Sequence, residues 1–164
     1  MVRIKNRYFL CELVFEDAVR RALMVGVQHL YSAVKDAVKE VHGDYGAAAL
    51  AWGLNVKYLN PHTGVMLIRV RRQNQKILST TLPFIKSVAG YPVTVRTLHI
   101  SGTIRCCQKF LIKYNRRQLV VLLKQCKTKE ERQQVKDSIR RCTLKPEEQE
   151  FGDGASSEDI ATQS

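Results

Sequence analysis

Hydrophobic residues recur along the first hundred positions with two different periods, and the order of those periods constrains the fold more than any other feature. Residues 9 to 15 alternate with a period of two, which predicts a β-strand, and positions 8, 10 and 14 between them are also apolar. Both faces of that strand therefore need cover. Residues 27 to 41 carry apolar side chains at helical spacing, and Gly43 is expected to end this helix.

A predicted hairpin follows the first helix. Its turn lies at residues 60 to 64, which are rich in turn-forming side chains, and its second strand spans residues 65 to 72. Alternation places positions 66, 68 and 70 on one face of that strand and positions 65, 67, 69 and 71 on the other. The apolar face of the strand before the turn is predicted to consist of Leu50, Trp52, Leu54, Val56 and Tyr58.

The first hundred residues end with a second helix and a fourth strand. Asn74 is the predicted cap of that helix, and Pro83 is expected to kink or end it. A strand is expected from about residue 91 to 100. The order strand, helix, strand, strand, helix, strand is the split βαβ pattern of a ferredoxin-like α+β sandwich, with one antiparallel sheet and two helices on one face. The core-facing residues of the second helix are predicted to be Ile77, Leu78, Thr81, Leu82 and Ile85.

The open face of such a sheet needs a cover, and the C-terminal segment can supply it. Ile104, Cys107, Leu111 and Tyr114 have helical spacing, and Thr128 with Glu131 forms a predicted capping box for a last helix that reaches about residue 141. We expect these helices to pack on the sheet or its edge, within a single domain of residues 1 to 145. Residues 146 to 164 are acidic, small and polar, so we expect a disordered acidic tail.

The charge distribution points to a polyanionic partner. Lys and Arg number 27 against 15 Asp and Glu, and residues 1 to 145 carry a net charge of +18. Between Asp44 and Glu130 there are 15 Lys and Arg and no acid, so this span contains no internal ion pair. Like charge at this density is destabilising unless a partner of opposite sign is present, and nucleic acid is the commonest such partner. A generally basic, soluble surface is the alternative interpretation.

The most concentrated cations follow the predicted fourth strand. Arg105, Lys109, Lys113 and Arg117 have a spacing of four, with Arg116 beside the last, so on a helix they form one ridge. Ser101 or Thr103 is the predicted cap. Gly102 and Thr103 at the helix start place unpaired backbone N–H groups where a phosphate can approach, and the ridge predicts a phosphate track. A solvated helix face is the alternative.

Other candidate RNA contacts lie on the strands: Arg3, Lys5, Arg7, Lys57, Arg69, Arg71 and Arg72. Such cations predict affinity and salt dependence more than sequence choice. The third strand lacks the aromatic residues that an RNA-recognition module uses to stack on single-stranded bases. Recognition of the shape and backbone of folded RNA is therefore the expected mode. Tyr8 is predicted to make a core or partner contact, with base stacking as the alternative.

Catalysis by the chain alone is not expected. The acid-free middle excludes paired carboxylates over half the chain, and no phosphate-binding glycine loop is present. A Cys106 nucleophile with His99 as its base is an alternative, but a structural thiol fits the five irregularly spaced cysteines better. These cysteines favour reduced thiols in a cytosolic or nuclear protein without a bound metal. No apolar run is long enough to cross a membrane, and no secretory signal is expected.

Several stretches resemble the ribonuclease P and ribonuclease MRP protein subunit of the Pop-five type. The matching stretches are MVRIKNRYFLCELVF, VHGDYGAAA, VKYLNPHTGVMLIRVRR, TLPFI and TLHISGTIRCCQKFLIKYNRRQLVVLL. The resemblance implies an RRM-like α/β sandwich and a non-catalytic subunit that binds the catalytic RNA core. Matched to the family motif, the best RNA contacts are Gly102, Thr103, Arg105, Lys109, Arg116 and Arg117.

The same resemblance implies the setting in which the chain acts. Its expected partners are ribonuclease P/MRP RNA, precursor tRNA within the complex, and an Rpp-thirty-type subunit with a barrel fold. The expected processes are removal of the 5′ leader from precursor tRNA and processing of pre-rRNA, in the nucleus and nucleolus. The protein itself is expected to bind no cofactor, and Mg²⁺ serves the RNA. A stand-alone RNA-acting enzyme and a basic protein-interaction module remain the two alternatives.

Overall fold

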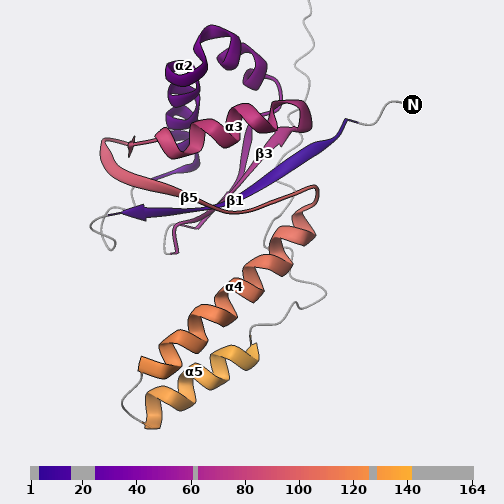
Figure 1. The fold of residues 1–164 in the computed structure, drawn as a ribbon. Helices are drawn as coiled ribbons and strands as arrows, with labels where there is room; N and C mark the ends of the chain where they lie inside the picture. Colours follow the sequence, from indigo (N-terminus) through magenta and orange to yellow (C-terminus); the bar gives the residue numbers. More distant parts are fainter. Residues whose placement is uncertain (1–3, 16–24, 61–62, 126–128, 142–164) are drawn as a thin grey trace, which may run out of the picture.

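A computed structural model describes residues 4–15, 25–60, 63–125 and 129–141. Its centre is a five-stranded antiparallel sheet with the strand order β2-β3-β1-β5-β4 (Figure 1). The strands are β1 (Asn6–Phe15), β2 (Asn55–Leu59), β3 (Val65–Arg71), β4 (Ser87–Val88) and β5 (Tyr91–Ser101). The helices are α2 (Val27–Ala51), α3 (Gln75–Thr81), α4 (Ile104–Gln125) and α5 (Lys129–Arg141), and short 3₁₀ turns are η2 (Arg72–Asn74) and η3 (Leu82–Phe84).

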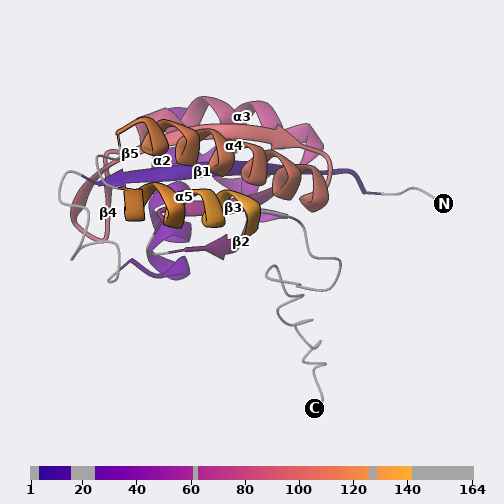
Figure 2. The same cartoon turned by 90° about the horizontal axis from the view of Figure 1, so that it is seen from below.

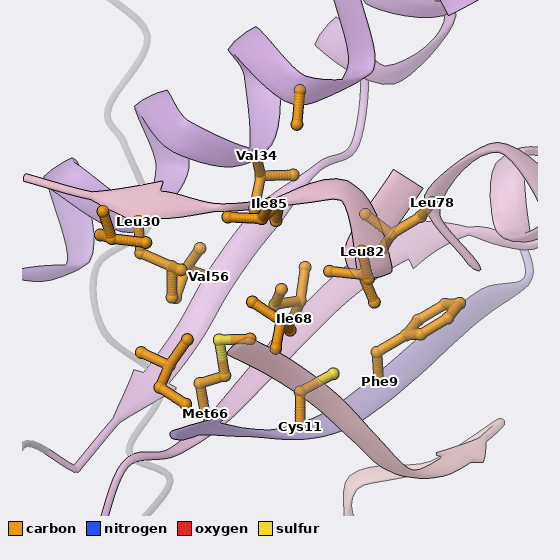
Figure 3. Close-up of a cluster of buried hydrophobic side chains, with 14 of the residues drawn as sticks. Phe9, Cys11, Leu30, Val34, Val56, Met66, Ile68, Leu78, Leu82 and Ile85 are labelled. Atoms are coloured by element: carbon orange, nitrogen blue, oxygen red, sulfur yellow. The ribbon is translucent and has the colours of Figure 1, made fainter. Parts of the chain in front are cut away.

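The main core lies between the sheet and the helices α2 and α3, which share one face of it (Figure 1). Phe9 and Cys11 of β1 and Met66 and Ile68 of β3 are fully buried against this layer (Figure 3). The predicted apolar faces of both strands are therefore confirmed. The structure has the predicted α+β architecture, consistent with the RRM-like class.

A second, smaller core lies on the opposite face of the sheet. Leu10 and Leu67 are fully buried there, and Cys107 of α4 packs against them. α4 contacts β1 and β5 on this face, and α5 runs alongside α4 (Figure 2). The expectation that the C-terminal helices pack on the sheet is confirmed for α4. The predicted last helix appears as α5, but α5 packs mainly on α4 and not on the sheet.

The end of the first helix differs from the prediction. Gly43 breaks the helical geometry with φ 65° and ψ −160°, but the helix resumes and continues to Ala51. The proposed strand face from Leu50 to Tyr58 was therefore wrong in its first part. Leu50 is a buried helical residue, Trp52 follows the helix end with 74% of its surface exposed, and β2 begins only at Asn55. The alanine-rich stretch after Gly43 favours helix, which explains why one glycine does not end it.

Asn74 precedes α3 but does not cap it through its side chain. The Asn74 Nδ2 atom donates instead to the Ala49 carbonyl at 2.5 Å, which ties the second half of α2 to η2. The prediction that Pro83 ends the helix is confirmed, because α3 ends at Thr81 and Pro83 lies in η3. The two-residue strand β4 was not predicted.

Several predictions lie outside the described residues: Arg3, the cap Thr128, Cys126, Cys142 and the acidic tail 146–164. The domain boundary at residue 145 accordingly stays a prediction. Among the helices that the structure describes, none has the length and apolar character needed to span a membrane.

Candidate nucleic-acid interface

Strand register brings three distant basic segments to one end of the sheet. Asn6 of β1 pairs with Arg71 of β3, and Tyr8 lies between Arg69 of β3 and Ser101 of β5. The first residues of β1 and the last residues of β3 and β5 therefore meet at the same end, where α4 also begins (Figure 1). We call this surface the basic end; its members are Lys5, Arg7, Arg69, Arg71, Arg72, Gly102, Thr103 and Arg105.

Three contacts join the beginning of β1 to its neighbours at the basic end. The Arg72 backbone N–H donates to the Lys5 carbonyl at 2.9 Å, so these two cationic residues are neighbours in space although they are far apart in the sequence. The Arg7 Nε atom donates to Gln75 Oε1 at 3.2 Å. The Arg7 guanidinium also lies against Gly102, where an added Cβ would be 2.9 Å from its Nη1 atom. Because Gln75 is neutral, this contact orients Arg7 without neutralising its charge.

The start of α4 has the predicted cap. The Thr103 Oγ1 atom accepts a hydrogen bond from the Cys106 backbone N–H at 3.3 Å, and Ser101 Oγ accepts one from the Thr103 N–H at 3.2 Å. Within the described chain, the Ile104 and Arg105 N–H groups have no acceptor. The Arg7 guanidinium lies against Gly102, just before these two donors in the chain, and together with the positive end of the helix dipole it makes the helix start favourable for an anion.

The predicted row of cations forms an exposed ridge on α4. We call these residues the basic ridge: Arg105, Lys109, Lys113, Arg116 and Arg117. The four members at a spacing of four follow one another at about 6 Å along the helix, and Arg116 lies directly before the last. All are exposed, whereas Cys107, Leu111 and Tyr114 of the same helix are at least half-buried. Among the described residues, no member of the ridge or of the basic end has an acidic ion-pair partner.

Lys57 does not join the basic end. It is half-buried on the edge strand β2, between Val56, which pairs with Ile68, and Tyr58, which pairs with Leu67. Arg69 does lie at the basic end, and its Nε atom is buried without a hydrogen-bond partner among the described residues. The structure therefore brings Lys5, Arg7, Arg69, Arg71 and Arg72 together and leaves Lys57 apart, and the role of each as an RNA contact stays a prediction.

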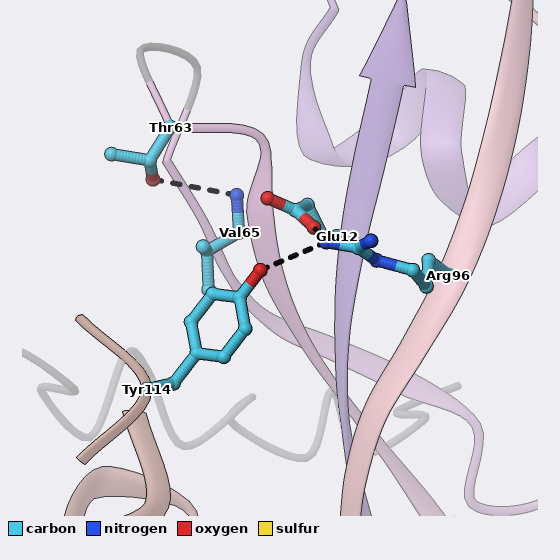
Figure 4. Close-up of polar contacts among 5 residues, drawn as sticks. All are labelled: Glu12, Thr63, Val65, Arg96 and Tyr114. Carbon is cyan, nitrogen blue, oxygen red and sulfur yellow. Dashed lines mark hydrogen bonds and ion pairs between the residues drawn. The ribbon is translucent and has the colours of Figure 1, made fainter. Parts of the chain in front are cut away.

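Among the described residues of the acid-free span, Arg96 is the cation that pairs with an acid, and that acid lies outside the span. The Arg96 Nη2 atom donates to Glu12 Oε2 at 2.5 Å and to Tyr114 Oη at 2.8 Å (Figure 4). The hydrogen bond to Glu12 and its negative charge raise the pKa of Arg96. This contact joins β1, β5 and α4, and local sequence patterns did not predict it. In the nearby hairpin turn, Val65 N–H donates to Thr63 Oγ1 at 3.4 Å (Figure 4).

The sheet face under α4 is occupied by side chains of the chain itself. The His99 ring stacks on Phe110 with a centroid distance of 4.5 Å and an interplanar angle of 4°. Tyr8 is half-buried against the second core, in agreement with its predicted core contact. Bases therefore have no open aromatic platform on this part of the sheet.

The metal-ligating side chains and the thiols of the described residues are the sequence candidates for other chemistry. They contain no group of three or more His, Cys, Asp or Glu side chains placed to hold a metal. Burial raises the pKa of the Cys11 thiol to about 12 and also raises the pKa of Cys107. Cys106 is exposed, and in this part of the chain no hydrogen bond joins it to His99. Buried thiols with a raised pKa are poor nucleophiles.

Comparison with known proteins gives a consistent result. A sequence model described as the Rpp14/Pop5 family matches residues 7–112. The Homo sapiens protein "Ribonuclease P/MRP protein subunit POP5" is 46% identical over 160 residues, covering 95% of this chain and 98% of the human one. The Danio rerio protein of the same name is 43% identical over 173 residues, covering 96% of each chain. A chain of the yeast ribonuclease MRP cryo-EM structure aligns with a TM-score of 0.48 and 16% identity, over 86% of this chain and 93% of that chain.

The family match and the sequence relatives confirm the resemblance noted from the sequence motifs. The family match includes β1, β3, β5 and the first turns of α4, which together form the basic end. On the match over residues 7–112 and the identity to the human and zebrafish proteins, this chain belongs to the Rpp14/Pop5 family.

Proposed function

We propose that this chain is a non-catalytic, RNA-binding subunit of ribonuclease P/MRP, and that its basic end and basic ridge contact the RNA of the particle. Its relatives carry the name of a ribonuclease P/MRP protein subunit. The observation that carries the RNA-binding role is the convergence of β1, β3 and the start of α4 at one end of the sheet, with cations that lack acidic partners among the described residues.

The physical role that we assign to these residues is charge neutralisation. RNA strands repel one another, and clustered Lys and Arg allow them to pack closely by displacing condensed counterions. The Arg7 guanidinium and the start of α4 favour one phosphate, and the exposed ridge continues along α4 for further phosphates. In this proposal the RNA performs the cleavage and uses Mg²⁺, while the protein holds the RNA strands in place.

Salt dependence follows directly from this arrangement. If about 6 to 10 phosphate contacts form, affinity should fall by about three to five orders of magnitude between about 50 and 200 mM salt. Phosphate contacts carry little sequence information, so the shape of a folded RNA would govern selection. The chain should therefore prefer structured RNA to a polyanion that lacks such shape, such as heparin.

The finer assignments belong to the same proposal. We assign precursor tRNA as the substrate of the complex, pre-rRNA processing as its second activity, and the nucleus and nucleolus as its location. An Rpp-thirty-type subunit is the proposed protein partner. The partner would bind elsewhere than the sheet face of the second core, because α4 already packs there. Co-purification of the two proteins from a mixture of purified components tests the partnership.

A binding titration with full-length protein and ribonuclease P RNA tests the proposed function. The expected result is saturable binding that weakens steeply with salt and resists heparin competition, with no cleavage of precursor tRNA by the protein alone in Mg²⁺. Cleavage by protein free of RNA would instead establish a stand-alone nuclease. Equal affinity for heparin and structured RNA would favour a basic module that binds acidic proteins.

A further inference from the structure

Trp52, the single tryptophan of the chain, is a large aromatic side chain left in solvent. It follows the last residue of α2, and 74% of its surface is exposed. Tryptophan is usually largely buried, because its ring has a large apolar area. Folding of the described chain leaves most of this side chain in solvent, and aromatic residues, tryptophan among them, are enriched at interfaces with partners.

The backbone places Trp52 next to arginines of the basic end. Gly53, the next residue, has φ +114°, and the Arg71 side chain lies directly against it. A Cβ added to Gly53 would be 2.8 Å from Arg71 Cγ and 3.2 Å from Arg71 Nε. Only a residue without a side chain leaves room for Arg71 here. Consecutive Cα atoms are about 3.8 Å apart, so the Arg71 side chain that contacts Gly53 also lies near the backbone of Trp52.

A buried amide fixes this part of α2 relative to η2. Asn74 is 6% exposed, and its Nδ2 atom donates to the Ala49 carbonyl, three residues before Trp52. Asn74 is the last residue of η2, whose first residue is the exposed Arg72. The Arg72 N–H in turn donates to the Lys5 carbonyl. Trp52, Arg71 and Arg72 are therefore held in one region by contacts that do not depend on their own side chains.

The charge around Trp52 favours nucleic acid over protein as the partner. The nearest acid before it in the sequence is Asp44, whose Oδ1 atom lies 4.0 Å from Lys39 Nζ, and no acid follows until Glu130. Arg71 and Arg72 have no acidic partner among the described residues. An exposed indole one residue from the Arg71 contact, with the exposed Arg72 next in the chain, is a combination that can bind a base through stacking and its phosphate through charge.

We propose that Trp52 stacks on an unpaired nucleotide of the bound RNA, with Arg71 and Arg72 on the adjacent phosphates. This inference rests on the proposed RNA-binding function and adds a contact to it. It is compatible with backbone recognition as the main mode, because a single bulged or looped base beside a folded helix suffices. It also lies outside the sheet face that α4 covers.

Tryptophan fluorescence reports on the proposed contact directly, because a stacked base quenches the emission of the indole. Trp52 is the single tryptophan of the sequence, so the signal comes from this position. Two RNA hairpins serve as probes, one fully paired and one identical except for a single bulged nucleotide. Full-length protein is titrated with each, and affinity is measured separately by anisotropy of a labelled hairpin. Trp52→Ala and Trp52→Phe are the test variants. Phe84→Ala is the matched control, since Phe84 is also exposed but lies in η3, beyond the far end of α3.

The expected result is quenching by the bulged hairpin and little quenching by the paired one. Trp52→Ala should weaken binding to the bulged hairpin by roughly 5- to 150-fold, the range for the loss of one stacked base. Binding to the paired hairpin should change by less than about twofold, as should the salt slope, since no phosphate contact is lost. Trp52→Phe should retain most of the affinity, and Phe84→Ala all of it.

Two outcomes overturn the inference in distinguishable ways. In the first, both hairpins bind with the expected salt dependence, but the bulged hairpin does not quench wild-type Trp52 fluorescence and Trp52→Ala binds with unchanged affinity. The stacking contact is then refuted, and a protein-binding surface becomes the better explanation for the exposed Trp52. If neither hairpin nor ribonuclease P RNA binds the wild-type chain, the proposed function fails and this inference fails with it.

Discussion

Reversing the charge of Arg105 and Lys109 together is predicted to weaken RNA binding without unfolding the chain. Both side chains are exposed on the outer side of α4, and neither has an acidic partner among the described residues. A carboxylate in the first turn of a helix interacts favourably with the helix dipole by about 0.3–1 kcal/mol, so Arg105→Glu should not destabilise α4. Cys107 and Tyr114, which hold α4 to the sheet, are not altered.

The size of the effect follows from counterion release. Each phosphate contact contributes about 0.9 to the slope of log affinity against log salt, so the loss of two contacts should reduce the slope by about 1.8. At about 0.1 M salt this corresponds to roughly eightfold per contact and about 60-fold for the pair. Repulsion between the new carboxylates and phosphate adds to this loss, which makes 60-fold a lower limit.

The assay is filter binding to ribonuclease P RNA at several salt concentrations, with a thermal melt of each variant. Lys35→Glu with Lys86→Glu is the matched control, because it changes the net charge equally at exposed positions on α2 and in the loop before β4. We expect the control to lose far less affinity and to keep its slope. If both double variants show the same affinity and the same slope, general charge and not the α4 surface governs binding, and the reasoning is refuted.

Three further predictions concern the fold itself. Gly64→Ala should lower the unfolding free energy by more than about 1 kcal/mol, because Gly64 has φ +67° and an added Cβ would lie against the Leu13 carbonyl; an unchanged melting temperature would contradict this. The free energy of unfolding should decline as pH rises from about 9 toward 12, because the Cys11 thiol ionises near its ordinary pKa of 9.0 in the unfolded chain and only near 12 in the folded one. In urea titrations across this pH range, Cys11→Ala should show a shallower decline. Tyr114→Phe should cost about 0.5–1.5 kcal/mol by removing the acceptor of the Arg96 hydrogen bond, and no loss in urea unfolding would show that this contact does not hold α4.

The strand faces were predictable because they depend on local alternation. The two faces of β3 follow from a period of two alone, and the structure buries Met66 and Ile68 on one side and Leu67 on the other. The need for cover on both sides of β1 also follows from local pattern, and α4 provides it.

The boundary between α2 and β2 could not be read from the same signals. Leu50 and Leu54 fit a strand with a period of two, but they are also four residues apart and fit a helix equally well. The backbone resolves the ambiguity in favour of helix through Ala51, and this leaves Trp52 in solvent. A residue assigned to the core from sequence is thus a surface residue.

The candidate site was predicted in its parts and not as a whole. The exposed ridge on α4 follows from a spacing of four, which is a local property. The meeting of Lys5, Arg7, Arg71 and Gly102 depends on the register between β1 and its two neighbours, and long-range pairing has no local signal. For the same reason the sequence did not show that Lys57 lies apart from this group.

Crosslinking of the full-length protein to ribonuclease P RNA in the assembled particle, followed by peptide mapping, tests the central claim most directly. The account predicts that crosslinked peptides concentrate on residues 5–7, 69–72 and 101–117, which the fold brings to the basic end and the ridge. Crosslinks confined to α2, η3 and β4, with the start of α4 free of nucleotide, would contradict it.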